Sequence, residues 1–263
     1  ASENGPVRLS DAQSGAERAM VPARVSGAAA LGVFPSSQWF AVADLANAIV
    51  VFDPLGNRDT VIAEDIAEPI SAIAVSTDNR LLAAATDGGQ LNVWALAPTR
   101  RLHTLPITGA RTYAMAFAPD ERRLAVASVD GSITLWDMQD GRRVAQWRGH
   151  TQRITGIAWS PDGRTLATTS FAGDARLWTI DAATPSDPRA LPGANALHLA
   201  FSTDGRWVIA AGATAGIRIY DATTGALAHE LATDRRGTRV LALTRDSNLL
   251  AALGDDNVVR RWR

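Results

Sequence analysis

Histidines, arginines and short Asp-Gly turns are the side chains of this sequence that could support chemistry. The four histidines, His103, His150, His198 and His229, lie far apart and lack the spacing of metal ligands. HELAT at 229–233 begins like the helix of a zinc protease, but no second histidine follows it. The chain has no Cys, so thiolate metal sites and disulfides are excluded.

Motifs for nucleophilic catalysis or dinucleotide binding are also missing. The sequence contains neither a G-x-S-x-G elbow nor a G-x-G loop. Its Asp-Gly turns resemble fragments of calcium loops, but they lack the spaced run of ligands that calcium needs. We therefore expect a protein that is not an enzyme and that has no cofactor and no metal site.

Binding to another molecule is the remaining possibility, and polar residues of the loops are the candidates for it. Arginine is favoured at protein interfaces because its planar guanidinium pairs well with carboxylates. The predicted partner-binding residues are Arg111, His150, Arg153, Asn195, Arg235, Arg236 and Arg239. All of them fall in connections that precede the first strand of a repeated unit.

An aromatic residue recurs every 42 residues and reveals these units. The residues at this interval are Phe52, Trp94, Trp136, Trp178, Tyr220 and Trp262. A turn aspartate keeps the same interval at Asp78, Asp120, Asp162, Asp204 and Asp246, and only Ser36 of the first unit departs. Asp beside Gly or Asn is typical of a tight reversal between strands. The spacing predicts six equivalent units over residues 27–263.

Within each unit, apolar residues alternate with a period of two, which indicates strands. The first strand carries Leu31, Ile73, Met115, Ile157, Leu199 and Leu241, followed two residues later by Val33, Val75, Phe117, Trp159, Phe201 and Leu243. The second carries Phe40, Leu82, Leu124, Leu166, Val208 and Leu250, and the third Ile49, Leu91, Ile133, Ala175, Ile217 and Val259. With a more polar fourth strand, each unit is predicted to be a four-stranded antiparallel sheet. Such sheets must cover one another, which predicts an all-β β-propeller.

Two segments resemble repeats of the WD-repeat (WD40) family. Residues 149–178, GHTQRITGIAWSPDGRTLATTSFAGDARLW, share its Gly-His pair, its SPDG turn and the tryptophan that ends the third strand. Residues 124–137, LAVASVDGSITLWD, match the second half of such a repeat. The resemblance covers nearly the whole chain and implies a WD40-type β-propeller.

The resemblance also implies structural roles for the signature residues. In the family, a strand-end Trp, a Ser or Thr, a Gly-His histidine and a turn Asp share hydrogen bonds within a blade. The third repeat has Asp130, Ser128 and Trp136, with Thr108 at the histidine position. The fourth repeat has His150, Ser170 and Trp178, with Ala172 in place of Asp. We expect apolar packing of Trp94, Trp136, Trp178, Tyr220 and Trp262 to dominate, at about 1.5–3 kcal/mol for each buried aromatic.

The two ends of the chain do not match in the repeat. The segment GSITLWD of the third repeat aligns with GPVRLSD at residues 5–11 when it is shifted by three repeat lengths, or 126 residues. The segment that follows residue 11 fits a fourth strand. We expect a single domain over 1–263 with closing strands in 1–26. In a six-bladed ring, residues 16–21 complete the last blade. In a seven-bladed ring, which we favour, residues 5–21 are half a blade, and an upstream part of the same, longer polypeptide completes the ring.

Composition narrows the class of partner. The formal net charge is −1 and the 26 basic residues, all arginine, are spread along the chain, so we expect no nucleic-acid partner. The use of arginine alone indicates a GC-rich, bacterial gene. No apolar run approaches the roughly 20 residues of a membrane span, so we expect no membrane insertion. The sequence leaves the compartment open, with the cytoplasm favoured.

Together these features predict a non-enzymatic scaffold for protein–protein interaction. It would bind a protein or peptide through the loop face around the propeller channel. The alternative is a sensor or regulatory WD-repeat domain of a larger bacterial multidomain enzyme, such as a kinase, a signalling ATPase or a protease.

Overall fold

A computed structural model describes most of the chain. It covers residues 8–10, 16–20, 28–35, 37, 39–64, 66–107, 111–181, 184–212, 216–232, 237–244, 247, 249–256 and 258–262. Of residues 8, 10, 19, 20, 28, 58, 59, 184 and 239 it describes the backbone alone. Two compact units, residues 1–117 and 118–263, make up the chain, and each is built from β-strands.

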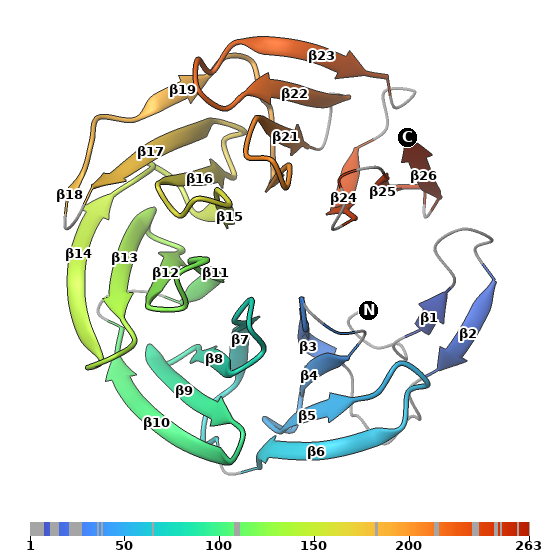
Figure 1. The fold of residues 1–263 in the computed structure, drawn as a ribbon, viewed down its shortest axis with the longest axis vertical. Coiled ribbons are helices and arrows are strands. Elements are labelled where there is room, and N and C mark those ends of the chain that lie inside the picture. Colours follow the sequence, from blue (N-terminus) through green and yellow to red (C-terminus); the bar gives the residue numbers. More distant parts are fainter. Residues whose placement is uncertain are drawn as a thin grey trace. The chain divides into compact units, whose positions relative to one another are not determined.

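Unit 1 holds the N-terminal hairpin, the first two repeats and the first strand of the third. Its strands are β1 (Arg8–Ser10), β2 (Glu17–Met20), β3 (Ala28–Val33), β4 (Phe40–Asp44), β5 (Ile49–Phe52), β6 (Arg58–Ala63), β7 (Ile70–Val75), β8 (Leu81–Thr86), β9 (Gln90–Leu96), β10 (Thr99–Pro106) and β11 (Thr112–Phe117). β1 and β2 form a two-stranded sheet, whereas β3–β6 and β7–β10 form four-stranded antiparallel sheets in chain order. β3 lies against β7, and β7 lies against β11 (Figure 1).

Unit 2 continues the same pattern. Its strands are β12 (Arg123–Ser128), β13 (Ser132–Asp137), β14 (Arg142–Arg148), β15 (Ile154–Trp159), β16 (Thr165–Ser170), β17 (Ala175–Asp181), β18 (Thr184–Pro185), β19 (Arg189–Leu191), β20 (His198–Phe201), β21 (Trp207–Ala211), β22 (Ile217–Asp221), β23 (Leu227–Leu231), β24 (Thr238–Leu243), β25 (Leu250–Gly254) and β26 (Val259–Trp262). In the fourth repeat, β18 and β19 both pair with β17 as an interrupted outer strand. β20–β23 form a four-stranded sheet, and β24–β26 form a three-stranded one.

The strand register confirms the predicted columns. In every repeat, the aromatic residue of the third strand lies directly opposite the apolar residue of the second-strand column. The pairs are Phe40 with Phe52, Leu82 with Trp94, Leu124 with Trp136, Leu166 with Trp178, Val208 with Tyr220, and Leu250 with Trp262. Directly opposite residues share a face of the sheet, so each repeat presents the same apolar pair to its neighbour.

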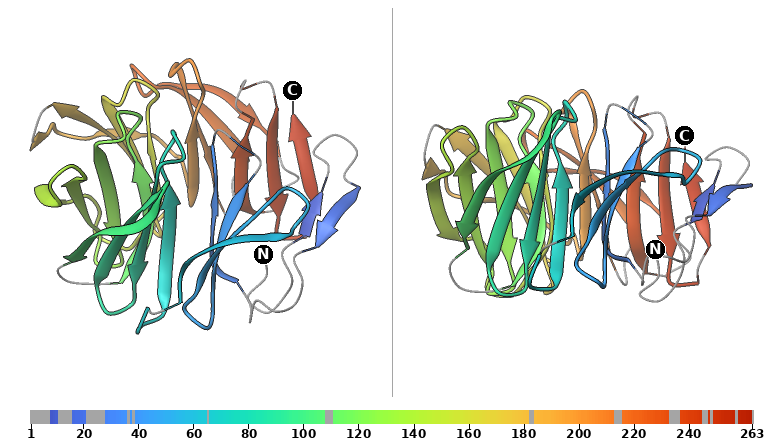
Figure 2. Two further views of the ribbon diagram at one scale, coloured as in Figure 1. Left: turned by 60° about the horizontal axis from the view of Figure 1, so that its bottom comes forward. Right: turned by 90° about the horizontal axis from the view of Figure 1, so that it is seen from below.

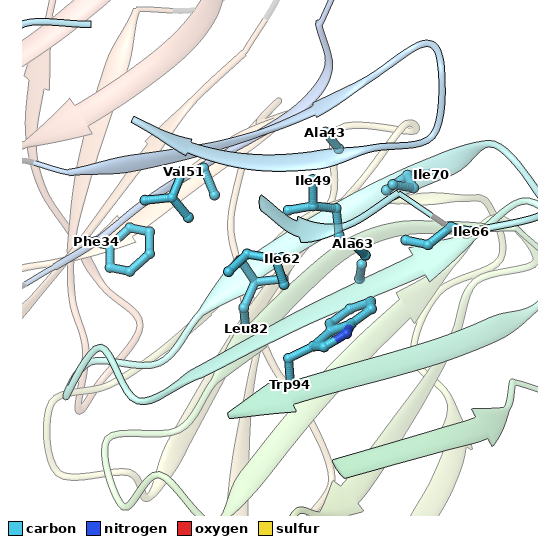
Figure 3. Packing of buried hydrophobic residues seen from close by; sticks show 12 residues of the cluster. Phe34, Ala43, Ile49, Val51, Ile62, Ala63, Ile66, Ile70, Leu82 and Trp94 are labelled. Carbon is cyan, nitrogen blue, oxygen red and sulfur yellow. The ribbon is translucent and has the colours of Figure 1, made fainter. Parts of the chain in front are cut away.

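Packing between consecutive sheets forms the core of each unit. In unit 1, Ile49 and Val51 of the first sheet pack with Leu82 and Trp94 of the second (Figure 3). In unit 2, a comparable cluster joins the fourth and fifth sheets around Tyr220. The described residues form strands and turns, with no helix among them. The chain is thus all-β, and its repeats stack within each unit as the blades of a propeller, as the sequence predicts.

The turn aspartates explain why the first two strands of each repeat reverse so sharply. Asp162 Oδ1 accepts hydrogen bonds from the Ser160 hydroxyl at 2.5 Å and from the Arg164 amide at 3.0 Å. Asp78 and Asp204 accept the equivalent bonds from Ser76 and Ser202. Satisfying donors inside the turn favours the reversal over an extended chain. Ser36 and Asp246 lie outside the described residues.

The last repeat departs from its column. The third-strand residues of the other repeats, from Ile49 to Ile217, are buried, but Val259 is 61% exposed and Trp262 is half-buried. In the described part of unit 2, no further sheet covers the outer face of β24–β26. The exposure of Val259 follows from that open face.

Candidate protein-binding surface

Connections at one end of each sheet position the predicted binding residues. In an antiparallel meander, the turn between strands two and three lies at the same end as the connection from strand four to the next strand one. Figure 2 shows the strands of each unit running alongside one another, so that their turns gather at two ends. In unit 1, Arg111 and the turn that follows β8 therefore lie at one end of the strands. In unit 2, the loops that contain Arg153 and Asn195 share one end with the turns that follow β12 and β16. We call this end the loop end of each unit.

An exposed phenylalanine stacked on an arginine marks this end of unit 2. The Arg153 guanidinium carbon lies 3.9 Å from the centroid of the Phe171 ring. The Phe171 amide donates a hydrogen bond to the Arg153 carbonyl at 2.9 Å, so the two residues are also linked through the backbone. Phe171 is still 54% exposed. The arrangement presents an aromatic ring to solvent and supports it by a cation–π contact.

Val129 occupies the same turn position one repeat earlier and is 38% exposed. In unit 1, Leu45 stands at this position and is 56% exposed. Loop tips of this kind are usually polar, and scattered exposed apolar residues are common. The same position holds Asp87 in the second repeat and Asp255 in the sixth, so the exposed apolar residue recurs in only some of the repeats. Sequence reasoning missed Phe171 and Val129, although aligning the turns by the 42-residue interval would have found both.

Arg111 is engaged by a carboxylate of its own unit. Its Nε lies 2.7 Å from Asp87 Oδ1, and both side chains are more than one-third exposed. An exposed pair of this kind contributes little to stability, about 0–1 kcal/mol. It does reduce the positive charge that Arg111 offers to a partner.

Of the other predicted loop residues, the structure describes Asn195 and the backbone of Arg239. Asn195 is exposed and has a φ of 43°, and its backbone runs between Gly173 and Gly212. A Cβ on Gly212 would lie 1.7 Å from the Asn195 carbonyl oxygen, so this close approach requires glycine. Arg235 and Arg236 lie outside the described residues. Arg239 lies in β24, and its side chain is outside the described part of the chain.

His150 requires a correction, because the structure places it inside the blade and not on the binding surface. Its side chain is fully buried. Nδ1 lies 2.8 Å from Asp174 Oδ2, and Nε2 lies 2.7 Å from the Thr168 hydroxyl. The Trp178 indole N–H donates to the same hydroxyl at 2.9 Å. Since the carboxylate can only accept, Nδ1 carries the hydrogen, and Thr168 donates to Nε2.

Asp174 completes a network that the sequence predicts to lack its aspartate. Ala172 does stand at the expected position, but Asp174, two residues later, reaches the imidazole from the same turn. Ser170 donates to its other carboxylate oxygen, and Arg176 Nε lies 3.2 Å from Oδ2. Repeat four is therefore held by a complete chain of hydrogen bonds as well as by apolar packing. Thr168, not Ser170, links the tryptophan to the histidine.

Electrostatics in this network favour a neutral imidazole beside an ionised carboxylate. Burial lowers the pKa of His150 below its ordinary value of 6.5, and Asp174 offsets only part of that shift. Burial alone would raise the pKa of Asp174, but hydrogen bonds from Ser170 and His150 and the charge of Arg176 outweigh it and lower the pKa. The network is therefore strongest near neutral pH.

Repeat three lacks the corresponding network in its described part. Trp136 is buried, with 6% of its surface exposed, yet its indole N–H has no hydrogen-bond partner among the described residues. Asp130 accepts instead from the amide and hydroxyl of Ser132, at 2.9 and 2.6 Å. Ser128 is also buried, whereas Thr108 lies outside the described residues. Packing is what the structure shows around Trp136, as expected from the sequence.

Unit 2 also contains a hollow between its fifth and sixth sheets. Its volume is about 560 Å³, and its lining includes Trp207, Ile219, His229, Leu231 and Trp262. The Trp207 and His229 rings meet edge to face with centroids 6.1 Å apart. The predominantly apolar lining suits an apolar side chain better than a charged ligand. His229, the first residue of HELAT, thus lies on strand β23 and not on a helix.

The described part of the chain offers neither a metal site nor a membrane-spanning helix. No three His, Cys, Asp or Glu side chains there come together as metal ligands. No helix in that part is long and apolar enough to cross a membrane.

Two protein families match parts of the chain. The WD domain, G-beta repeat family matches residues 141–179, which run from β14 through most of β17. The anaphase-promoting complex subunit 4 WD40 domain family matches residues 73–159. A comparison with curated proteins found no match. Both family matches cover repeats whose sheets and register are described above.

Proposed function

The chain belongs to the WD-repeat family of β-propellers, and from that premise we propose that it is a scaffold that binds a protein or peptide through the loop end of its blades. WD-repeat propellers generally mediate protein–protein interaction and are typically non-catalytic. The observation that carries the proposal is the exposed ring of Phe171, stacked on Arg153 at the loop end of unit 2.

An aromatic ring of this kind loses little conformational entropy on binding. Aromatic residues and arginine dominate the energetics of protein interfaces, and an aromatic ring buries a large area with few rotatable bonds. Stacking on Arg153 holds the Phe171 ring in place before the partner arrives, which reduces the ordering cost of association. Val129 of the neighbouring repeat adds apolar surface at the same turn position.

The charges at the loop end of each unit point to an apolar contact as the main source of affinity. The sequence suggests a face that prefers acidic partners, but Asp87 and Asp174 pair with Arg111 and Arg176. We therefore propose a partner segment with an apolar side chain that packs on Phe171. The regulatory role within a larger multidomain enzyme stays a prediction from the sequence.

Replacing Phe171 by Asp should weaken partner binding roughly tenfold or more, because it removes the anchor and places a charge in a desolvated contact. The free energy of unfolding should change by less than about 1 kcal/mol, because the ring is more than half exposed. A photo-crosslinking phenylalanine analogue at position 171 in the native host would identify the partner. Titration of that partner against the wild type and against Phe171→Asp would give the two affinities to compare.

Leu227 provides the matched control. It is 45% exposed in β23, at the opposite end of the strands from the loop end. A crosslinker at 227 should give no adduct with that partner, and Leu227→Asp should leave its affinity unchanged. Equal adducts from both positions, or full affinity in Phe171→Asp, would place the binding surface elsewhere.

A further inference from the structure

The N-terminal hairpin has the geometry of the outer half of a blade. In β1–β2, Arg8 pairs with Met20, Leu9 with Ala19 and Ser10 with Glu17, and the register shifts between Leu9 and Ser10. Residues 126 positions later, in β13–β14, form the same three pairs with the same shift, between Leu135 and Trp136. β1 and β2 therefore correspond to the third and fourth strands of a repeat.

This hairpin covers only the outer part of the first four-stranded sheet. Leu9 packs on a cluster formed by Phe40, Val42, Val50 and Phe52 of β4 and β5. Within that cluster, the Phe40 and Phe52 rings stack with centroids 5.5 Å apart. The half-blade thus occupies the place that a neighbouring blade takes in the other repeats.

The inner part of the same face is open. On β3, Leu31 pairs with Val42 and Val33 pairs with Phe40, so all four side chains lie on one face of the sheet. Leu31 is 43% exposed and Val33 is 61% exposed.

The next repeat shows what normally covers these positions. Ile73 and Val75 stand at the equivalent positions of β7 and are partly buried against the first sheet. A Cβ on Gly32 of β3 would lie 3.2 Å from Ile73 Cδ1. An inner strand of the preceding blade therefore supplies the cover. Among the described residues, the sheet of β1 and β2 contains no such strand.

We infer that polypeptide preceding residue 1 supplies the two missing strands. They would add to the edge of β1 that β2 leaves open and would cover Leu31 and Val33, giving a sheet of four strands in the order of the other repeats. The register of β1 and β2 favours this segment over an unrelated partner, because these strands already correspond to the third and fourth strands of a repeat. The inference does not depend on the loop-end binding site.

The repeat fixes what the preceding segment should look like. Moved back by 126 residues, Met115, Phe117 and Leu124 predict apolar residues 12, 10 and 3 positions before Ala1. Asp120 predicts a turn residue 7 positions before Ala1. A natural reading frame that lacks this alternation and turn would overturn the inference without any biochemistry.

The natural chain with about 20 further residues at its N-terminus should be compared with residues 1–263. Amide exchange in the peptide containing residues 8–10 should slow at least tenfold in the longer chain, because β1 gains a second strand neighbour. The double variant Leu31→Asp, Val33→Asp should lower the melting temperature of the longer chain by several degrees and leave residues 1–263 nearly unchanged. Leu227→Asp should be neutral in both.

Two results would contradict this assignment. Unchanged exchange at residues 8–10 in the longer chain would mean that the preceding segment does not pair with β1. A dimer of residues 1–263 that Leu31→Asp dissociates, and that persists in the longer chain, would make a second copy the occupant.

Discussion

Replacing Trp136 by Ala should lower the free energy of unfolding by about 3–5 kcal/mol, the cost of emptying a large buried site. Trp136 lies on β13, opposite Leu124 of β12, and is almost fully buried. Its indole N–H has no hydrogen-bond partner among the described residues, so lost packing accounts for the effect. Equilibrium urea unfolding of the wild type and the variant measures the difference directly.

Substitution by phenylalanine separates packing from hydrogen bonding. Trp136→Phe removes the indole N–H but keeps most of the apolar ring, whereas Trp178→Phe also removes the bond to Thr168. We expect the change at 178 to cost about 1 kcal/mol more than the change at 136. Unaltered unfolding of Trp136→Ala would show that the aromatic column does not hold the sheets together.

Replacing His150 by Ala should cost about 3 kcal/mol, because it leaves Asp174 and Thr168 without their shared partner and opens a cavity. The imidazole is fully buried and bonds both residues. Urea unfolding at pH 7.5 measures the loss. His229→Ala, at an exposed position of β23, is the matched control and should change stability by less than about 0.5 kcal/mol.

The pH dependence of the same measurement tests the charge state of the network. The pKa of His150 is lower in the folded protein than its ordinary value of 6.5. The unfolded chain therefore takes up a proton first as the pH falls, and stability declines below about pH 6.5, by up to about 1.4 kcal/mol per pH unit for each such histidine. His150→Ala should remove its share of this slope and leave that of His198, whose pKa burial also lowers. Equal slopes in the two proteins would contradict a buried neutral imidazole.

The strands and their register could be predicted because the repeat samples each position six times. One strand with apolar residues at alternate positions is ambiguous, but Leu82, Leu124 and Leu166 at equal intervals are not. Their pairing with Trp94, Trp136 and Trp178 follows once the turn length is constant. The 42-residue interval and the turn residues therefore predict which strands pair and in what register, without any information on packing.

The hydrogen-bonded network could be predicted only in part. Column alignment looks for the carboxylate at residue 172 and finds alanine. A turn is short enough that a side chain two residues later, at Asp174, reaches the same imidazole. Side chains at different positions of the repeat can make the same hydrogen bond when the path of the backbone brings them to the same place. A sequence alignment does not contain that path.

The proposed binding surface was the least predictable feature, for a similar reason. His150 looks like a loop residue in the sequence but is buried by the sheet that follows it. Phe171 looks like a core residue because it is aromatic, yet it stands at the tip of a turn. Exposure is set by tertiary packing, which polarity alone does not reveal. From the sequence, His150 is therefore placed among the surface residues, and Phe171 is not singled out.

Hydrogen–deuterium exchange along the whole chain tests the repeat architecture most directly. In a four-stranded sheet, strands two and three pair on both sides and exchange slowest. Protection should therefore peak at β8–β9, β12–β13, β16–β17 and β21–β22, at intervals of 42 residues. Protection maxima that ignore this interval, or equal protection of inner and outer strands, would contradict the account.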